Sequence, residues 1–299
     1  MVKKARLIYN PVSGNEQMPA QVAGILNTLE QAGYEASAYQ TTVEDNSAKN
    51  EAKRVGEAGF DLVVAAGGDG TINEVVNGIA PLENRPKMAI IPAGTTNDFA
   101  RALHIPRDDM QAAAKVILEG KTMGMDIGLA GDKYFMNIAG SGSLTELTYG
   151  VPSEFKSVLG YAAYVIKGAE MLPKIHAVNM HLKWDGGEYK GKLSLFLLAM
   201  TNSIGGFEQV VPDASLADGE FTLIGVKTAN PVDVLRLLAM AFNGNHINDP
   251  KVIYEKTTHL SVEVLDKNEE VPVNLDGELG GYLPLEFQNL KQHIEFFVK

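Results

Sequence analysis

The sequence lacks cysteine, long apolar runs and an excess of basic residues, and each absence excludes a class of protein. With no Cys among 299 residues, the chain has no disulfide framework, no thiolate metal cluster and no cysteine nucleophile. Its longest apolar runs, such as Leu193–Met200, fall far short of the ~20 residues that a membrane helix needs. The N-terminus lacks the apolar stretch and the cleavage site of a secretory signal. We therefore expect a cytoplasmic protein.

The charge balance is acidic, since 26 Lys and Arg residues face 37 Asp and Glu residues for a net charge of -11. A negative net charge opposes sequence-independent attraction to nucleic acids and to anionic lipid surfaces. We therefore expect no nucleic-acid partner. The length suggests two domains, because a domain takes about 150 residues.

Up to residue 128, short apolar runs alternate with segments of helical spacing. This βαβ pattern is typical of a mainly parallel sheet that helices cover on both faces, with ligands beyond the carboxyl ends of the strands. We expect strands at Arg6–Tyr9, Ala36–Tyr39, Leu62–Ala66, Met88–Ile91 and Thr122–Ile127, and helices at Met18–Gln31, Asn46–Ala58, Thr71–Asn77 and Asp108–Glu119.

After Gly128 the pattern changes to apolar or alternating segments with turn residues between them, which predicts a β-rich domain. Expected strands are Lys133–Ile138, Val178–Trp184, Glu188–Met200, Glu220–Val226 and His259–Val264, and expected helices are Glu154–Met171 and Pro231–Phe242. No Pro/Gly/Ser-rich linker separates the halves. We predict an α/β domain over 1–128, onto which the C-terminal residues can pack back, and a β-rich domain over 129–299.

Three glycine-containing loops follow predicted strands and belong at one edge of the sheet. They are Asn10–Gly14, Gly67–Thr71 and Gly94–Asp98. Glycine lets backbone N–H groups approach an anion closely, and a following helix N-terminus adds partial positive charge. Turning the chain would explain any one loop, but three together, each with a Ser or Thr, predict a phosphate site. The glycine patterns of P-loop and dinucleotide-binding enzymes are absent.

Asp69 lies inside one of these loops, where its carboxylate would repel phosphate. A divalent cation resolves this conflict, because Mg²⁺ bridges carboxylates to substrate phosphates. The residue therefore favours magnesium-nucleotide chemistry. The structural alternative is an N-cap for a helix that begins near Thr71.

The motifs around the loops resemble a known enzyme family. Gly67-Gly68-Asp69-Gly70-Thr71 with Asn73-Glu74 is shared in outline by diacylglycerol kinases, sphingosine and ceramide kinases, NAD kinases and, more loosely, phosphofructokinases. Four further motifs narrow the choice: Asn10-Pro11-Val12-Ser13-Gly14, Gly94-Thr95-Thr96-Asn97-Asp98-Phe99-Ala100-Arg101, Pro212-Asp213-Ala214 with Asp218-Gly219, and Asp276-Gly277-Glu278. In this order, and over essentially the whole chain, they resemble the soluble diacylglycerol kinases of bacteria.

The resemblance implies a fold and an activity. The fold would be a nucleotide-binding α/β domain and a β-sandwich domain, with the active site in the cleft between them. The activity would be Mg²⁺-dependent transfer of the ATP γ-phosphoryl group to the free hydroxyl of diacylglycerol, which yields phosphatidate. In Gram-positive bacteria this returns diacylglycerol left by lipoteichoic acid synthesis to phospholipid. It also implies a homodimer that visits the inner face of the membrane during turnover.

The resemblance also implies roles for individual residues. ATP contacts would come from Asn10, Pro11, Val12, Ser13, Gly14, Thr41, Gly67, Gly68, Asp69, Gly70, Thr71, Ile72, Asn73 and Thr95. Arg101 and Lys167 match basic positions that would neutralise phosphate charge, although each would otherwise be a solvated helix charge. The family's first motif is usually followed by a basic residue, whereas this chain has Asn15, which removes one implied phosphate contact.

The acidic residues would supply the base and the metal site. Glu278 matches the general base, in a tight Asp-Gly-Glu turn; without the resemblance it would be a surface acid. Asp218 matches a Mg²⁺ ligand, together with the carbonyl oxygens of Ser215 and Glu220. Asp69 and Asp126 resemble members of the same aspartate–water–magnesium network. For Asp126 the structural alternative is an acid at a strand end, capping a turn before Gly128.

Three other activities stay open on the sequence. A kinase for another lipid alcohol, such as phosphatidylglycerol or a sphingoid base, would share the nucleotide loops. An NAD kinase would lack the Asn-Pro-x-Ser-Gly loop and the Asp-Gly-Glu turn. A catalytically idle nucleotide- or lipid-binding regulator would have no need for Asp69, Asp218 and Glu278 together.

Overall fold

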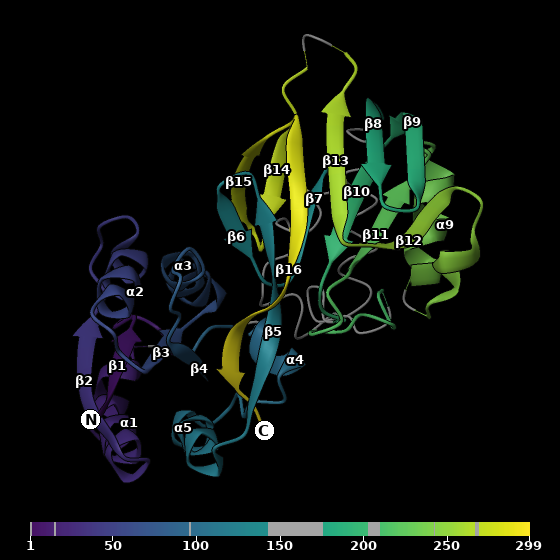
Figure 1. The fold of residues 1–299 in the computed structure, drawn as a ribbon. Helices are drawn as coiled ribbons and strands as arrows, with labels where there is room; N and C mark the ends of the chain where they lie inside the picture. The colour runs from purple at the N-terminus through teal and green to yellow at the C-terminus, as the bar shows by residue number, and fades with distance from the viewer. Residues whose placement is uncertain are drawn as a thin grey trace. The chain divides into compact units, whose positions relative to one another are not determined.

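The computed structural model describes residues 2–14, 16–95, 97–142, 176–202, 210–241, 243–266 and 269–299. The chain divides into two compact units (Figure 1). Unit 1 comprises Met1–Ile127 together with Leu290–Lys299, and unit 2 comprises Gly128–Asn289. The C-terminal segment thus belongs to the same unit as the N-terminal half.

Unit 1 is built on a parallel sheet with the strand order β2-β1-β3-β4-β16. Its strands are β1 (Lys3–Tyr9), β2 (Tyr34–Gln40), β3 (Leu62–Gly67), β4 (Lys87–Pro92) and the end of β16 (Leu285–Phe297), and β5 (Thr122–Ala130) also pairs with β16. All six residues of β3 are buried, as expected for a parallel strand that helices cover on both faces.

Helices α1 (Met18–Gln31) and α5 (Met110–Glu119) cover one face of this sheet, and α2 (Ser47–Glu57) and α3 (Asp69–Ile79) cover the other (Figure 1). A short helix, α4 (Asp98–Ala102), follows β4. The predicted helix at Asp108–Glu119 begins two residues later because Asp109 is its N-cap, accepting hydrogen bonds from the amides of Gln111 and Ala112 at 2.9 and 3.0 Å.

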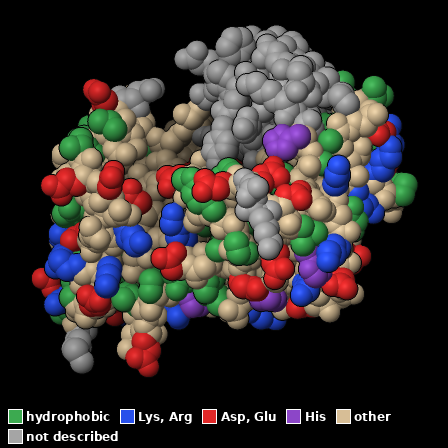
Figure 2. All heavy atoms as spheres, turned by 90° about the horizontal axis from the view of Figure 1, so that it is seen from above, with side chains coloured by type: hydrophobic (Ala, Val, Ile, Leu, Met, Phe, Trp, Pro, Cys, Tyr) green, Lys and Arg blue, Asp and Glu red, His purple; other side chains and the backbone are tan. Residues whose placement is uncertain are grey.

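Charge is mixed on the surface despite the acidic excess. The face shown in Figure 2 carries Lys and Arg side chains interspersed with Asp and Glu side chains among the described residues. Charges of both signs in close spacing leave the field there weaker than the net charge suggests.

Unit 2 is a sandwich of two antiparallel sheets. One has the order β12-β11-β10-β7-β14-β15, and the other has the order β16-β13-β8-β9. The strands are β6 (Lys133–Phe135), β7 (Ile138–Ser141), β8 (Val178–Trp184), β9 (Gly187–Leu193), β10 (Leu195–Ala199), β11 (Phe221–Val226), β12 (Val252–Thr257), β13 (His259–Val264), β14 (Pro272–Leu275) and β15 (Glu278–Tyr282); β6 pairs with β5.

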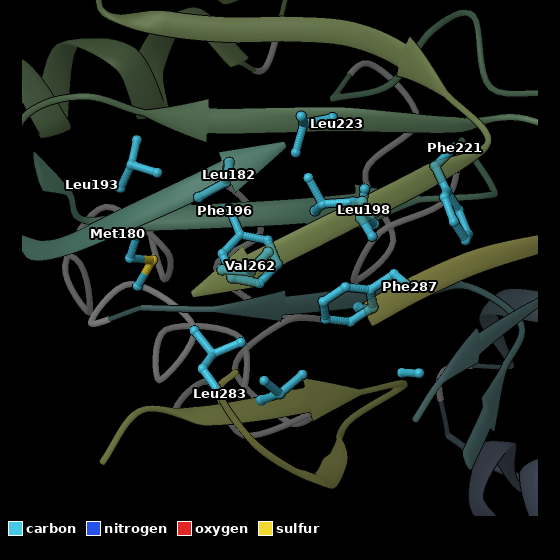
Figure 3. Close-up of a cluster of buried hydrophobic side chains, with 14 of the residues drawn as sticks. Met180, Leu182, Leu193, Phe196, Leu198, Phe221, Leu223, Val262, Leu283 and Phe287 are labelled. Carbon is cyan, nitrogen blue, oxygen red and sulfur yellow. The ribbon is translucent and has the colours of Figure 1, made fainter. Parts of the chain in front are cut away.

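The core of unit 2 lies between these sheets. Met180 and Leu182 of β8 face Phe196 and Leu198 of β10 across it (Figure 3). Helix α9 (Pro231–Ala241) covers the outer face of the six-stranded sheet, where Leu237 joins a second apolar cluster. A 3₁₀ turn, η2 (Asn245–Asn248), follows it.

Two predicted segments are wrong as single strands. Glu188–Met200 is two strands in different sheets, because the chain crosses from one layer to the other at the buried Ser194, whose amide bonds Val226 O at 3.0 Å. Lys133–Ile138 is likewise divided between β6 and β7. Each break includes a polar residue, Ser194 or Asn137, and the strands on both sides of it contribute apolar side chains to the same core.

The predicted helix Glu154–Met171 lies outside the described residues. Among the residues that the structure describes, no helix is both long enough and apolar enough to cross a membrane.

Candidate active site

The three glycine loops leave adjacent strand ends of unit 1 and are held together by backbone hydrogen bonds. The amide of Asn10 bonds Ala66 O at 3.0 Å, the amide of Gly14 bonds Ala93 O at 2.8 Å, and the amide of Ala93 bonds Gly67 O at 2.8 Å. The loops after β1, β3 and β4 therefore form one connected surface at the carboxyl edge of the sheet, where ligands bind in open α/β folds.

Two glycines are favoured here for different reasons: Gly94 because the backbones of the second and third loops touch each other, and Gly14 because of its left-handed backbone. A Cβ on Gly94 would stand 2.6 Å from the Cα of Gly68. Gly14 has a φ of +63°, and a Cβ there would stand 2.5 Å from the Cε of Met110. Close packing between loops thus accounts for part of the glycine pattern, alongside the access to backbone amides that a phosphate needs.

Helix α3 begins at Asp69, with Gly68 as its N-cap. The expected alternative, in which Asp69 caps a helix starting near Thr71, is wrong because the extended backbone lies at Gly68 instead. Asp69 occupies the first turn, where the helix dipole stabilises a carboxylate. The amides of this turn have no intrahelical acceptor, which is the arrangement that binds anions at helix N-termini.

Asn97 joins the second and third loops, a role that sequence reasoning missed. Its amide donates to Asp69 Oδ2 at 3.1 Å. Its side chain closes the third loop, accepting from the amide of Gly94 at 2.9 Å and donating to Gly94 O at 2.8 Å. Asn97 has a φ of +50° and is 5% exposed. An Asn after a Gly-Thr-Thr loop is a recognisable sign of a turn, but its bond to Asp69 spans 28 positions.

The remaining predicted ATP contacts differ in what they can offer a ligand. Val12 and Thr95 are exposed, and Thr41 and Thr71 are partly buried. The Ile72 side chain is fully buried in the core, so only its backbone could face a ligand. Asn10 folds the first loop, because its side chain accepts from the amide of Val12 at 3.1 Å and its carbonyl accepts from the amide of Ser13 at 3.2 Å. Thr41 follows β2, and its amide bonds Tyr9 O at 2.9 Å. Asn73 Oδ1 accepts from Asn77 Nδ2 at 3.0 Å.

Two charged residues of unit 1 lie in contrasting surroundings. Arg101, in α4, has its Nε shielded from solvent, and no acceptor for that atom lies among the described residues. Asp126 is 2% exposed, and its Oδ1 accepts from the amide of Gln292 at 2.8 Å. Its expected alternative as a strand-end cap is wrong, because β5 continues to Ala130. Lys167 and Asn15 lie outside the described residues.

Glu74 also has a structural role that the sequence did not show. Its Oε2 accepts from the amides of Ala48 and Lys49, at 2.9 and 3.4 Å, at the start of α2. Asn46, the N-cap residue of α2, makes no capping bond with its side chain. Glu74 of α3 thus supplies the missing cap from another helix.

In unit 2, Glu278 is the first residue of β15, directly after a two-residue hairpin turn. Asp276 and Gly277 form this turn with φ angles of +52° and +104°. The Asp-Gly pair is the expected signal for a type I′ hairpin turn. The Glu278 side chain is exposed, so it is accessible to a substrate.

The acidic loop before β11 is attached to β12. Tyr254 OH donates to Asp213 Oδ1, and Lys256 Nζ donates to Asp213 O at 2.9 Å. The same ammonium lies 3.9 Å from Asp218 Oδ2. Burial raises the pKa of Tyr254 well above its ordinary range, with Asp213 adding to the effect, so the phenol stays protonated and donates. Asp218 Oδ1 accepts from the amide of Glu220 at 3.1 Å.

Comparison with known proteins identifies the family. The family model for the diacylglycerol kinase catalytic domain matches residues 4–130, and that for the YegS C-terminal NAD kinase beta sandwich-like domain matches residues 151–298. The chain is 51% identical to a diacylglycerol kinase of Bacillus subtilis, over 98% of this chain and 95% of that one. The chain belongs to the diacylglycerol kinase family. A Staphylococcus haemolyticus relative of the same name is 50% identical over 99% of this chain and 88% of its own.

The fold comparison agrees with this assignment. The crystal structure of a putative diacylglycerol kinase from Bacillus anthracis superposes with a TM-score of 0.84 at 26% identity, covering 99% of this chain and 95% of that one. The predicted resemblance and the predicted fold class, a mainly parallel α/β domain followed by a β-sandwich, are both confirmed.

Diacylglycerol kinases transfer phosphoryl groups, a reaction in which Mg²⁺ commonly neutralises the phosphates. The loop before β11 is the predicted magnesium site. Among the described residues, no group of three or more His, Cys, Asp or Glu side chains could hold a metal ion. The predicted ligands are instead one carboxylate, from Asp218, and the carbonyl oxygens of Ser215 and Glu220. Only oxygen donors are offered, and the Asp218 side chain is 33% exposed. This set fits Mg²⁺, which takes few protein ligands and keeps several waters.

Proposed function

We propose that the protein transfers the γ-phosphoryl group of ATP to the free hydroxyl of diacylglycerol, yielding phosphatidate. The observation that carries this proposal is the conjunction of 51% identity to a diacylglycerol kinase with three glycine loops joined at one sheet edge. The family alone would allow other lipid alcohols. The role would be to return diacylglycerol to phospholipid in a Gram-positive cell, at the inner face of the membrane.

The glycine loops would bind the ATP phosphates through backbone amides. The first turn of α3 offers backbone N–H groups that have no acceptor within the helix, and the positive end of a helix dipole. Arg101 supports the same assignment, because its shielded Nε–H has no acceptor in the part of the chain that the structure describes, and such a guanidinium favours an anionic ligand. In phosphoryl transfer such positioning and charge neutralisation supply most of the catalysis.

Glu278 would accept the proton of the acceptor hydroxyl as the phosphoryl group arrives. A placed carboxylate contributes about 10²–10⁴-fold to such a step. When bound, Mg²⁺ would neutralise charge on the phosphates. Asp218 and the carbonyl oxygens of Ser215 and Glu220 would hold it. Asp69 and Asp126 would join that network through water, as the resemblance implies.

A panel of acceptors tests the proposal. The protein is incubated with [γ-³²P]ATP and Mg²⁺ in mixed micelles that contain diacylglycerol, phosphatidylglycerol or sphingosine, and with NAD in solution. We expect label in phosphatidate above all. Stronger labelling of another lipid would move the assignment to that acceptor, labelling of NAD alone would reject a lipid substrate, and no labelling would leave a nucleotide- or lipid-binding regulator.

The metal assignment has its own test. We expect Asp218→Asn to lower activity and to move the Mg²⁺ titration to higher concentration, because the only carboxylate ligand is lost. Asp266→Asn, which changes an exposed carboxylate elsewhere in unit 2, is the control. A titration of Asp218→Asn that overlays that of Asp266→Asn would reject the site.

A further inference from the structure

The turn before Glu278 is tied to the rest of unit 2 by a side chain. Both carboxylate oxygens of Asp276 accept hydrogen bonds from backbone amides of the β6–β7 connection and the first residue of β7. Oδ2 accepts from Met136 at 2.6 Å, and Oδ1 accepts from Asn137 at 2.8 Å and from Ile138 at 2.9 Å. The Asp276 amide in turn bonds Ile138 O at 2.9 Å. Three amides on one carboxylate form a charge-assisted cluster.

A second side chain fixes the other half of the turn. Asn274 is 9% exposed, and its Oδ1 accepts from the amide of Gly277 at 3.0 Å. Together, Asn274 and Asp276 hold both turn residues. A type I′ turn needs only residues that tolerate a positive φ, such as Asn-Gly or Gly-Gly. The three amide bonds of Asp276 therefore exceed what the turn alone requires.

The connection that receives Asp276 also holds the end of β10. Asn137 O accepts from the amide of Met200 at 2.9 Å, and Asn137 Oδ1 accepts from Thr201 Oγ1 at 3.4 Å. Asp276 thus attaches the Glu278 turn to a point where the start of β7 and the end of β10 are already joined. The backbone of Glu278 is therefore fixed two residues away, at Asp276, by hydrogen bonds to this junction.

We infer that Asp276 is a positioning residue for phosphoryl transfer, which fixes the backbone of Glu278 through the amides of Met136, Asn137 and Ile138. The inference rests on the proposed role of Glu278 as the base. A general base must lie within hydrogen-bond reach of the proton it removes, and misplacement by about 1 Å can cost on the order of 10²-fold in rate. An exposed acid at a hairpin end needs such a support.

The test is Asp276→Asn, which keeps the size of the side chain and its tolerance of positive φ but offers one acceptor oxygen in place of two. Asp132→Asn, in the exposed β5–β6 turn, is the matched control. We expect Asp276→Asn to lower kcat on the order of tenfold or more, with the KM for ATP within about twofold of wild type, and Asp132→Asn to change neither.

A double-mutant cycle with Glu278→Gln separates positioning from general weakening. If Asp276 acts through Glu278, adding Asp276→Asn to Glu278→Gln lowers the residual kcat by less than about twofold. An equal fractional loss in both backgrounds, a wild-type kcat for Asp276→Asn, or a raised KM for ATP would overturn the inference. If Asp276→Asn does not fold, Asp276→Glu, which keeps the charge but displaces the turn, is compared with wild type and combined with Glu278→Gln in the same way.

Failure of the proposed function is visible separately. If Glu278→Gln alone retains the wild-type kcat, Glu278 is not the base, and the positioning role of Asp276 falls with it. If Glu278→Gln is impaired and Asp276→Asn is not, only the positioning role is rejected.

Discussion

At the scale of single residues, Asp69 is accommodated among glycines by its backbone surroundings. It starts α3, where the helix dipole favours a negative charge, and its Oδ2 accepts from the amide of Asn97. The third loop therefore holds the acid of the second loop in place. The glycines on either side allow this because the two loop backbones approach too closely for side chains.

Asn97→Ala tests whether the closed third loop aims the Asn97 amide at Asp69, because Ala keeps that amide but loses the side-chain bonds that shape the loop. The change removes both side-chain bonds to Gly94 and places Ala at a φ of +50°, so we expect a loss of about 1–3 kcal/mol in the free energy of unfolding and a KM for ATP raised by about tenfold. Denaturant unfolding and ATP titration of the rate measure the two effects.

Asn46→Ala is the control, because Asn46 has the same left-handed backbone at a φ of +61° but makes no capping bond with its side chain. If Asn46→Ala and Asn97→Ala change the KM for ATP alike, the loop link does not serve nucleotide binding.

At the scale of elements, Glu74 connects two helices that are separate in sequence. Ala48, in the first turn of α2, lies 26 positions before Glu74, and its amide and that of Lys49 donate to this side chain. The cap also anchors the chain just after the β2 loop that contains Thr41. Helix α3 therefore both carries Asp69 and supports its neighbour on the same face of the sheet.

Glu74→Gln should destabilise unit 1 by about 1 kcal/mol, because the charged acceptor at a helix N-terminus is replaced by a neutral one. Glu57→Gln is the matched control. It lies at the other end of α2, where its ion pair with Lys53 spans 3.9 Å and is solvent-exposed, so its loss should change the free energy of unfolding by less than about 0.5 kcal/mol. Equal effects in urea unfolding would contradict the capping role.

The sequence predicted elements well where local signals agree. Met18–Gln31 matches α1 to the residue, and Val178–Trp184 and His259–Val264 match β8 and β13. It failed where a long-range contact decides, as at Ser194, where the chain changes sheets. The same holds in the candidate site. The turn at Asp276 is readable from Asp-Gly, but its partners at Met136–Ile138 lie 138 to 140 positions away.

At the scale of the whole molecule, one buried histidine, His246, and one partly buried histidine, His293, make stability depend on pH. Burial lowers the pKa of His246 in unit 2 and of His293 in unit 1. The unfolded chain, with ordinary values near 6.5, then binds more protons than the folded chain below that pH. Above about pH 6.5 these histidines are neutral in both states and leave the free energy of unfolding unchanged. As the pH falls below that value, protonation of the unfolded chain lowers the free energy of unfolding.

We therefore expect Tm to fall between about pH 7.5 and pH 5.5, before the acidic groups with lowered pKa values, such as Glu51 and Asp249, begin to titrate below about pH 4.5. His246→Gln should reduce the slope of stability against pH in this window, because it removes the histidine whose pKa burial lowers. A Tm that rises toward pH 5.5 would contradict the prediction.

The measurement that tests the central proposal most directly is the rate of phosphatidate formation from diacylglycerol by Glu278→Gln. The control is Glu263→Gln, which changes an exposed strand glutamate of the same unit. We expect kcat to fall by about 10²-fold or more in Glu278→Gln, with the KM for ATP little changed, and to stay at the wild-type value in Glu263→Gln. Undiminished phosphatidate formation by Glu278→Gln would contradict the proposal that this glutamate activates the lipid hydroxyl.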